Sequence, residues 1–139
     1  MQATCTEGER RELEISANAE EWLAFADLLD TTSGAIKFPG RAAESPHEFP
    51  IRNLLIRSEE RAQLLISVDP AAIDATIAGR PEHLERFARV VRSFAQKSRR
   101  GQADPIENRG PDHFIDPESV LTVFHMSGED APRQGEVGG

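Results

Sequence analysis

Four histidines are the residues of this chain that could ligate a transition metal. They are His47, His83, His113 and His125. A zinc site needs several His or Cys ligands at short spacings, and none of the four has such a partner. If the last strands form a hairpin that turns at Pro117-Glu118, His113 lies opposite Thr122 and not opposite His125. The sequence therefore predicts surface or packing histidines and no metal cofactor.

The residue types that carry catalysis are also isolated from one another. Asp112, Asp116 and Glu118 could form an acid pair, but a turn attracts such residues in any case. Four serines, Ser16, Ser67, Ser93 and Ser119, lack the nucleophile elbow, and the chain has no glycine-rich phosphate loop. Cys5 is the only cysteine and predicts a buried or incidental thiol. The sequence thus predicts neither an enzyme nor a bound cofactor.

The composition is typical of one ordinary globular domain. The 139 residues are 38% hydrophobic and 29% charged, with a net charge of −8. That charge repels nucleic acid and anionic lipid, so neither is an expected partner. The first residues resemble no secretory signal, and no run approaches the roughly 18 apolar residues of a membrane span. We expect a cytoplasmic protein.

The chain resembles itself at a fixed offset, which predicts an internal duplication. Each residue and its counterpart are 62 positions apart, as Ile15 and Ile77 are. The identical pairs are Ile15 and Ile77, Glu20 and Glu82, Phe25 and Phe87, and Ala26 and Ala88. Two amphipathic helices could also share such a pattern by chance.

The first unit reads as a strand followed by a helix. Residues 12–17 alternate in polarity and predict a half-buried strand, paired with residues 2–6. Asn18 then begins a helix through a capping box with Glu21. The helix carries an apolar stripe of Trp22, Phe25, Ala26 and Leu29. Glu20, Asp27 and Asp30 lie on its opposite face. A polar, irregular loop is expected to run to residue 50.

The second unit repeats this order. Residues 51–57 and 62–68 read as a hairpin, and a further strand at 73–78 leads to Pro81, which begins the second helix. Leu84, Phe87, Ala88 and Val91 repeat the apolar stripe, and Phe94 and Ala95 extend it. Residues 98–111 read as a mobile loop, and residues 113–116 and 120–126 as a last hairpin.

These elements predict an α+β fold. A single domain covers residues 1–126 and contains two strand-helix-strand-strand units, at about 1–61 and 62–126. One mainly antiparallel sheet, or two abutting sheets, carries both helices on the same side. Residues 127–139 have almost no apolar content and read as a disordered acidic tail.

Two segments resemble a known family. The run Leu65-Ile66-Ser67-Val68-Asp69, with residues 75–84 after it, resembles the strand, glycine and Pro-Glu helix opening of the immunity protein 32 family of bacterial polymorphic toxin systems. Residues 111–123 are similar to the final hairpin of that family. The likeness covers about residues 12–126 and departs in the loop after Ser98 and in the tail. It implies a cytoplasmic protein that binds and neutralises a cognate toxin without catalysis.

The distribution of charge agrees with a protein partner of basic character. Residues 1–30 hold eight acidic and two basic side chains, whereas residues 80–100 hold two acidic and seven basic. An acidic face would steer a basic toxin domain towards the protein. Glu20, Asp27 and Asp30 are the residues expected to bind it. The simpler alternative is a solvated helix face that serves solubility.

The last two residues point to a different class of function. The chain ends in Gly138 and Gly139. A unit of two strands, a helix and two strands is also the order of a ubiquitin-like domain, and a terminal Gly-Gly suits activation and conjugation. A ubiquitin-like modifier is therefore the alternative to a toxin-neutralising protein. Deleting the two glycines would distinguish them.

Overall fold

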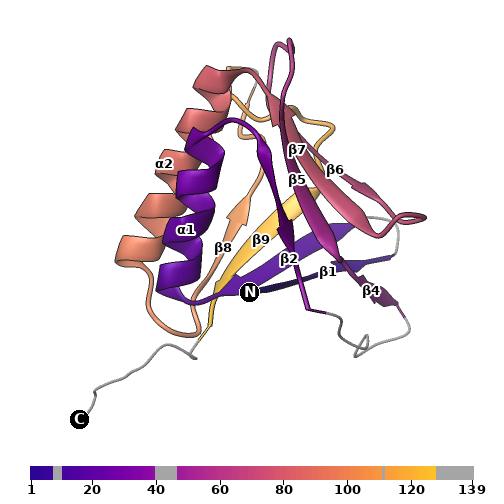
Figure 1. The fold of residues 1–139 in the computed structure, drawn as a ribbon, viewed down its shortest axis with the longest axis vertical. Coiled ribbons are helices and arrows are strands. Elements are labelled where there is room, and N and C mark those ends of the chain that lie inside the picture. The colour runs from indigo at the N-terminus through magenta and orange to yellow at the C-terminus, as the bar shows by residue number, and fades with distance from the viewer. Residues whose placement is uncertain (8–10, 40–46, 111, 128–139) are drawn as a thin grey trace.

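The computed structural model describes residues 1–7, 11–39, 47–110 and 112–127, and within them the chain has an α+β fold (Figure 1). The helices are α1 (Ala19–Asp30) and α2 (Pro81–Lys97). The strands are β1 (Gln2–Thr6), β2 (Glu12–Ala17), β3 (Gly34–Lys37), β4 (Glu48–Pro50), β5 (Asn53–Ser58), β6 (Leu65–Asp69), β7 (Asp74–Gly79), β8 (Ala103–Ile106) and β9 (Leu121–Met126). Figure 1 shows the two helices side by side, on one side of the strands.

The strands form two mixed, mostly antiparallel sheets. Sheet A has five strands in the order β4-β1-β2-β9-β8, and sheet B has four in the order β3-β5-β7-β6. The parallel pairs are β2 with β9 and β5 with β7. Each parallel pair therefore lies inside its sheet, with antiparallel strands on either side. This confirms the expected fold class, in its version with two sheets.

The two halves of the chain exchange strands. The hairpin before α1 joins the strands after α2 in sheet A, and the hairpin before α2 joins β3 and β5, which follow α1, in sheet B. Glu12 and Asp74 begin β2 and β7, and Ala19 and Pro81 begin the helices, so both pairs keep the 62-residue offset. A duplicated unit would give this arrangement. The duplication itself stays a prediction.

The core lies between the helices and the two sheets. Both predicted helix stripes are buried in it, and Trp22 is fully buried. Its indole ring packs on Phe124 of β9 with ring centroids 4.5 Å apart, and its Nε1 donates to the carbonyl oxygen of His125 at 3.2 Å. The Asn18 and Glu21 capping box is present, which fixes where α1 begins. The local predictions for both helices are confirmed.

The hairpin predicted from residues 51–57 and 62–68 is wrong. β5 and β6 are not neighbours, because β7 lies between them and pairs with β5 in parallel and with β6 antiparallel. A short polar connection favours an antiparallel pair but does not require one. β7 occupies the inner position beside β5, and its last residues Ile77, Ala78 and Gly79 are all buried.

The last predicted hairpin is also wrong, and so are two predicted loops. β9 pairs with β2 and β8, so Thr122 lies opposite Leu13 and Ile106, not His113. Ile115 forms an isolated parallel bridge to Leu64.

Two segments predicted as loops contain strands. β8 lies within the loop expected at 98–111, and β4 lies within the loop expected to reach residue 50. Both strands contain proline, which sequence reasoning takes as a sign of irregular structure, and both lie at sheet edges, where proline is tolerated.

Two further predictions concern the ends of the chain and membranes. The predicted tail at 127–139 falls, from residue 128 on, outside the described residues. In the described part of the chain, neither helix has the length and apolar character that crossing a membrane would require.

Candidate protein-interaction surface

Sheet A turns one face to the core and one face away from both helices. Along β2, Leu13, Ile15 and Ala17 are buried, while the residues between them are only partly so. The alternation follows from the two-residue period of a strand. The strand registers place the outward residues of all five strands on one face. They are Gln2, Thr4, Thr6, Glu12, Glu14, Ser16, Glu48, Pro50, Ala103, Pro105, Leu121, Val123 and His125. We call this set the outer face.

The outer face is acidic. It carries Glu12 and Glu14 on the central strand β2 and Glu48 on β4. Its thirteen outward positions, all of them described, hold neither lysine nor arginine. Glu14 Oε1 lies 2.9 Å from Nε2 of His125, and both side chains are about one third exposed, at 35% and 34%. Within the described residues Glu12 forms no ion pair and Glu14 pairs with a histidine, so neither of these two carboxylates is paired with lysine or arginine.

Aliphatic side chains adjoin these carboxylates. The parallel register places Leu121 beside Glu12 and Val123 beside Glu14. Residues paired across neighbouring strands have their Cβ atoms about 5 Å apart. An arginine or lysine from a partner could lay its methylene groups on the aliphatic residue and bring its charged end to the carboxylate. This combination suits a basic protein surface.

The face expected to bind a partner on α1 is only partly available. Glu20, Asp27 and Asp30 are all exposed, as predicted. However, Arg92 of α2 donates to Asp27 Oδ1 at 2.8 Å and to Asp30 Oδ2. Both carboxylates are thus neutralised within the protein, and they raise the pKa of Arg92. Glu20 alone of the three makes no ion pair within the described residues.

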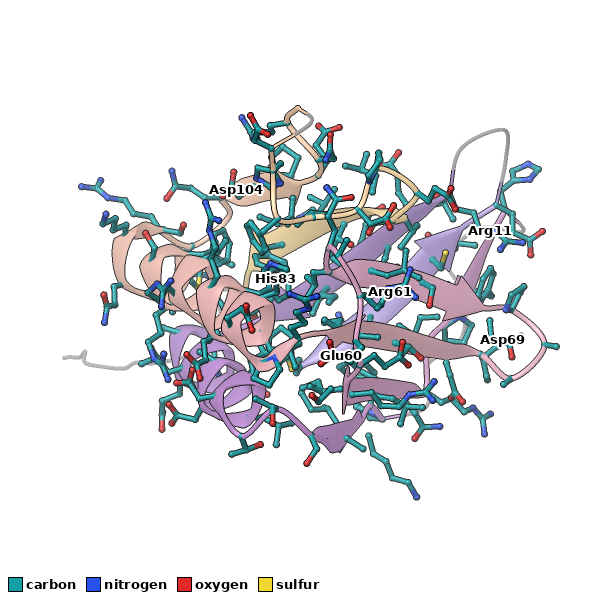
Figure 2. All side chains as sticks on the ribbon, turned by 90° about the horizontal axis from the view of Figure 1, so that it is seen from above. Arg11, Glu60, Arg61, Asp69, His83 and Asp104 are labelled. Carbon is teal, nitrogen blue, oxygen red and sulfur yellow. The ribbon has the colours of Figure 1, made fainter. Side chains whose placement is uncertain are left out.

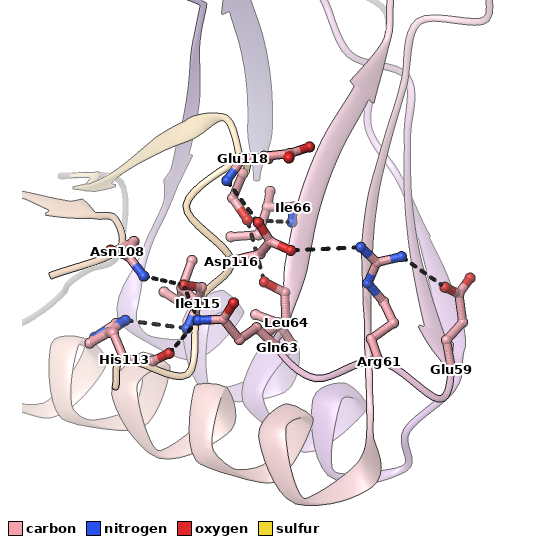
Figure 3. A network of polar contacts seen from close by, with 11 residues as sticks. Glu59, Arg61, Gln63, Leu64, Ile66, Asn108, His113, Ile115, Asp116 and Glu118 are labelled. Atoms are coloured by element: carbon pink, nitrogen blue, oxygen red, sulfur yellow. Dashed lines mark hydrogen bonds and ion pairs between the residues drawn. The ribbon is translucent and has the colours of Figure 1, made fainter. Parts of the chain in front are cut away.

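The suspected acid pair belongs to a structural clasp between β6 and residues 113–120 (Figure 3). Asp116 accepts from the Glu118 amide at 2.8 Å, which is a side-chain turn, and lies 3.8 Å from Arg61. Leu64 donates its amide to Phe114 and accepts from Asp116, at 2.7 and 2.8 Å. Asp116 and Glu118 therefore lie in a turn, although it is not the hairpin turn that the sequence predicted, and Asp112 is exposed.

The histidines do not converge. In the part of the chain that the structure describes, no three side chains of His, Cys, Asp or Glu are grouped as metal ligands. Figure 2 shows labelled polar residues, among them His83, Asp69 and Arg11, spread over the molecule. Cys5 is buried, and that burial raises the pKa of its thiol to about 11, which makes it a poor nucleophile.

His113 has a polar role within the fold. Its Nδ1 accepts from the amide of Ile115 at 3.2 Å. Burial, followed by the nearby charges of Arg86 and Arg109, lowers the pKa of His113 below its ordinary value of 6.5. His113 lines a surface hollow, and the carboxylates of Asp104 and Glu107 line it as well. The neutral imidazole is therefore the form that the folded state favours.

This lowered pKa predicts a loss of stability in mild acid. The unfolded chain binds the proton of His113 more readily, so the free energy of unfolding should fall as the pH drops below about 6.5, towards the pKa of the folded state. We expect the urea midpoint of the parent to fall more between pH 7.5 and 5 than that of His113→Gln. Equal falls in both proteins would contradict the prediction.

A comparison with known protein families, curated proteins and solved structures finds no significant match to this chain.

Part of the outer face could have been predicted from the sequence, since Glu12 and Glu14 alternate with buried residues in the predicted strand. What the sequence did not reveal is that β9 adds Leu121 and Val123 beside them.

Proposed function

We propose that this chain is a binding protein of the immunity type, which neutralises a basic toxin domain by holding it on the outer face, without catalysis of its own. The observation that carries the proposal is the pairing of Glu12 and Glu14 with Leu121 and Val123 on a sheet face that neither helix covers. The sequence resemblance to immunity protein 32 supports the toxin as the kind of partner.

The outer face is large enough to form the centre of such an interface. The five strands have three to six residues each, which is roughly 10 to 20 Å, and lie about 4.8 Å apart, so the projected area is roughly 400 Å². A stable interface buries about 800 Å² on each partner. The contact would therefore extend beyond the sheet, and a hollow of about 460 Å³ adjoins it at Gln2 and Ser16.

This adjoining hollow adds a further carboxylate. Glu21 lines it together with Asn18 and Met1. Burial opposes the ionisation of Glu21, but hydrogen bonds from the N-terminal ammonium group at 2.6 Å and from the Asn18 amide at 3.0 Å outweigh it and lower the pKa of Glu21. The side chain is therefore charged at neutral pH, but the ammonium group neutralises it, so Glu21 adds a polar group to this hollow and no net negative charge.

Cell protection tests the proposal directly. The genes on either side of the gene of this chain should be searched for a basic toxin domain, which should then be expressed with and without the chain while growth is measured. We expect growth to be restored, and the two purified proteins to form a stable complex. A toxin that still kills the cells, and that does not bind the purified chain, would refute the proposal.

Deleting Gly138 and Gly139 separates the proposed function from that of a modifier. Both residues lie outside the described part of the chain. If binding by the folded surface gives protection, the shortened chain should protect cells as well as the full chain does. If the chain is a ubiquitin-like modifier, its terminal carboxylate must be activated, so the deletion should abolish activity at an unchanged melting temperature. That second outcome would favour the modifier.

A further inference from the structure

A second surface, of opposite charge to the outer face, lies between α2 and β8. One hollow of about 530 Å³ is lined by Arg86, Arg89 and Lys97 of α2 and by Asp104 of β8. A smaller hollow of about 190 Å³ continues it towards Arg109, His113 and Phe114. Both hollows include Val90 and Asp104, so they form one continuous groove. We call it the α2–β8 groove.

The cations of this groove are available to a ligand. Within the described residues, Arg86, Arg89, Lys97 and Arg109 form no ion pair, whereas Arg61, Arg80 and Arg92 each pair with a carboxylate. All four side chains are exposed. Arg86 and Lys97 are eleven positions apart on α2, which at 1.5 Å per residue is about 16 Å. The groove therefore presents four cations, against the carboxylates of Asp104 and Glu107 in its lining, in a protein with a net charge of −8.

The groove also has an apolar floor. Phe94 and Phe114 are buried at its base, with the partly buried Val90 between them in the lining. The guanidinium carbon of Arg86 lies 4.9 Å from the centre of the Phe114 ring, a cation–π contact that holds this cation at the wall. The lowered pKa of His113 has Arg86 and Arg109 among its causes, in agreement with a positive potential here.

The edge of β8 limits how a ligand can bind. Met126 donates its amide to Gln102, so in the alternating pattern of an antiparallel pair Asp104 bonds to β9, while Ala103 and Pro105 turn their backbone to the free edge. Pro105 has no amide hydrogen to offer there. An added strand would lack that bond, which weakens pairing at this edge and favours recognition through side chains of the groove.

We propose that the α2–β8 groove binds an acidic peptide segment of a protein partner. An extended segment of five residues spans about 16 Å, the distance between Arg86 and Lys97 along the helix. Carboxylates of the segment would meet Arg86, Arg89, Lys97 and Arg109, and an apolar side chain would cover Val90 and Phe94. This inference does not depend on the proposed function, because it concerns another surface and the opposite charge.

Fluorescence anisotropy with a defined probe tests the inference on the full chain. The probe is a fluorescein-labelled ten-residue peptide of alternating Glu and Leu, compared with peptides that carry Lys or Gln in place of Glu. We expect only the Glu peptide to bind. The double variant Arg86→Glu and Arg89→Glu should weaken binding at least about 30-fold, as expected for the loss of two charge-assisted contacts.

A matched control uses two exposed cations far from the groove in the fold. Lys37→Glu with Arg57→Glu, on β3 and β5, makes the same change in net charge and should alter the affinity less than about threefold. The double variant Lys97→Glu and Arg109→Glu is a second groove variant. Lys97 lies at the end of α2, and Arg109 lies after β8. Equal losses in the control and groove variants, or none in either groove variant, would overturn the inference.

Two further outcomes would assign the groove to another occupant. Tighter binding of the probe after removal of residues 128–139 would show that the acidic end of the chain competes for the groove. If polyphosphate of the same total charge displaces the labelled peptide as well as the unlabelled peptide does, the leucines contribute nothing and the groove is a general anion site. Either result would overturn the assignment to a partner peptide.

Discussion

Trp22→Ala is expected to lower the free energy of unfolding by about 4 kcal/mol, a large part of the stability of a domain of this size. The indole ring is fully buried and packs on rings from three elements: Phe25 of α1, Phe94 of α2 and Phe124 of β9. Alanine would leave a cavity at the point where both helices meet sheet A. It would also leave the carbonyl oxygen of His125 without its donor.

Urea denaturation at pH 7.5 measures this effect. Phe87→Ala, on the apolar stripe of α2, should cost about 3 to 5 kcal/mol, because its ring is equally buried and packs on Phe114 and Phe124. The neighbouring Leu23 is 36% exposed, and Leu23→Ala is the control, expected to change stability by less than about 1 kcal/mol. Equal effects at Trp22 and Leu23 would show that the buried face of α1 is assigned wrongly.

The features that sequence reasoning predicted correctly are local ones. The stripe from Trp22 to Leu29, the Asn18 cap and the start of α2 at Pro81 depend on residues within a turn or two of one another. Strand pairing depends on residues far apart. β5 and β7 are both short and apolar, and nothing in either sequence states that they pair in parallel while β6 takes the edge.

The same distinction explains the candidate sites. The exposure of Asp27 and Asp30 follows from the helical period, but their neutralisation depends on Arg92, more than sixty residues away and brought close by helix packing. Glu12 and Glu14 could be placed on one face from their alternation alone. Whether that face is covered depends on the side that both helices occupy, which no local pattern determines.

Reversing the charge of the outer face is expected to slow the association with a basic toxin domain about 100-fold at low ionic strength. Glu12→Lys with Glu14→Lys replaces the two central carboxylates of the face by cations that repel such a partner. Because exposed charges act at long range, the effect should appear mainly in the association rate and should shrink at 0.5 M salt, where the screening length is about 4 Å. Stopped-flow measurement at two salt concentrations gives both values.

Two comparisons make this result specific to the outer face. Glu82→Lys with Glu85→Lys changes the net charge equally, at exposed positions of α2, and should slow association less than about tenfold. Glu20→Lys tests the exposed side of α1. Its counterpart on the sheet is the single variant Glu12→Lys. If Glu20→Lys slows association more than Glu12→Lys does, the partner binds the helix and not the sheet. If the Glu12 and Glu14 double variant associates as fast as the parent and keeps its melting temperature, the outer face is not the binding surface. A basic partner that binds there could not meet two reversed charges, a change of four units, at an unchanged rate.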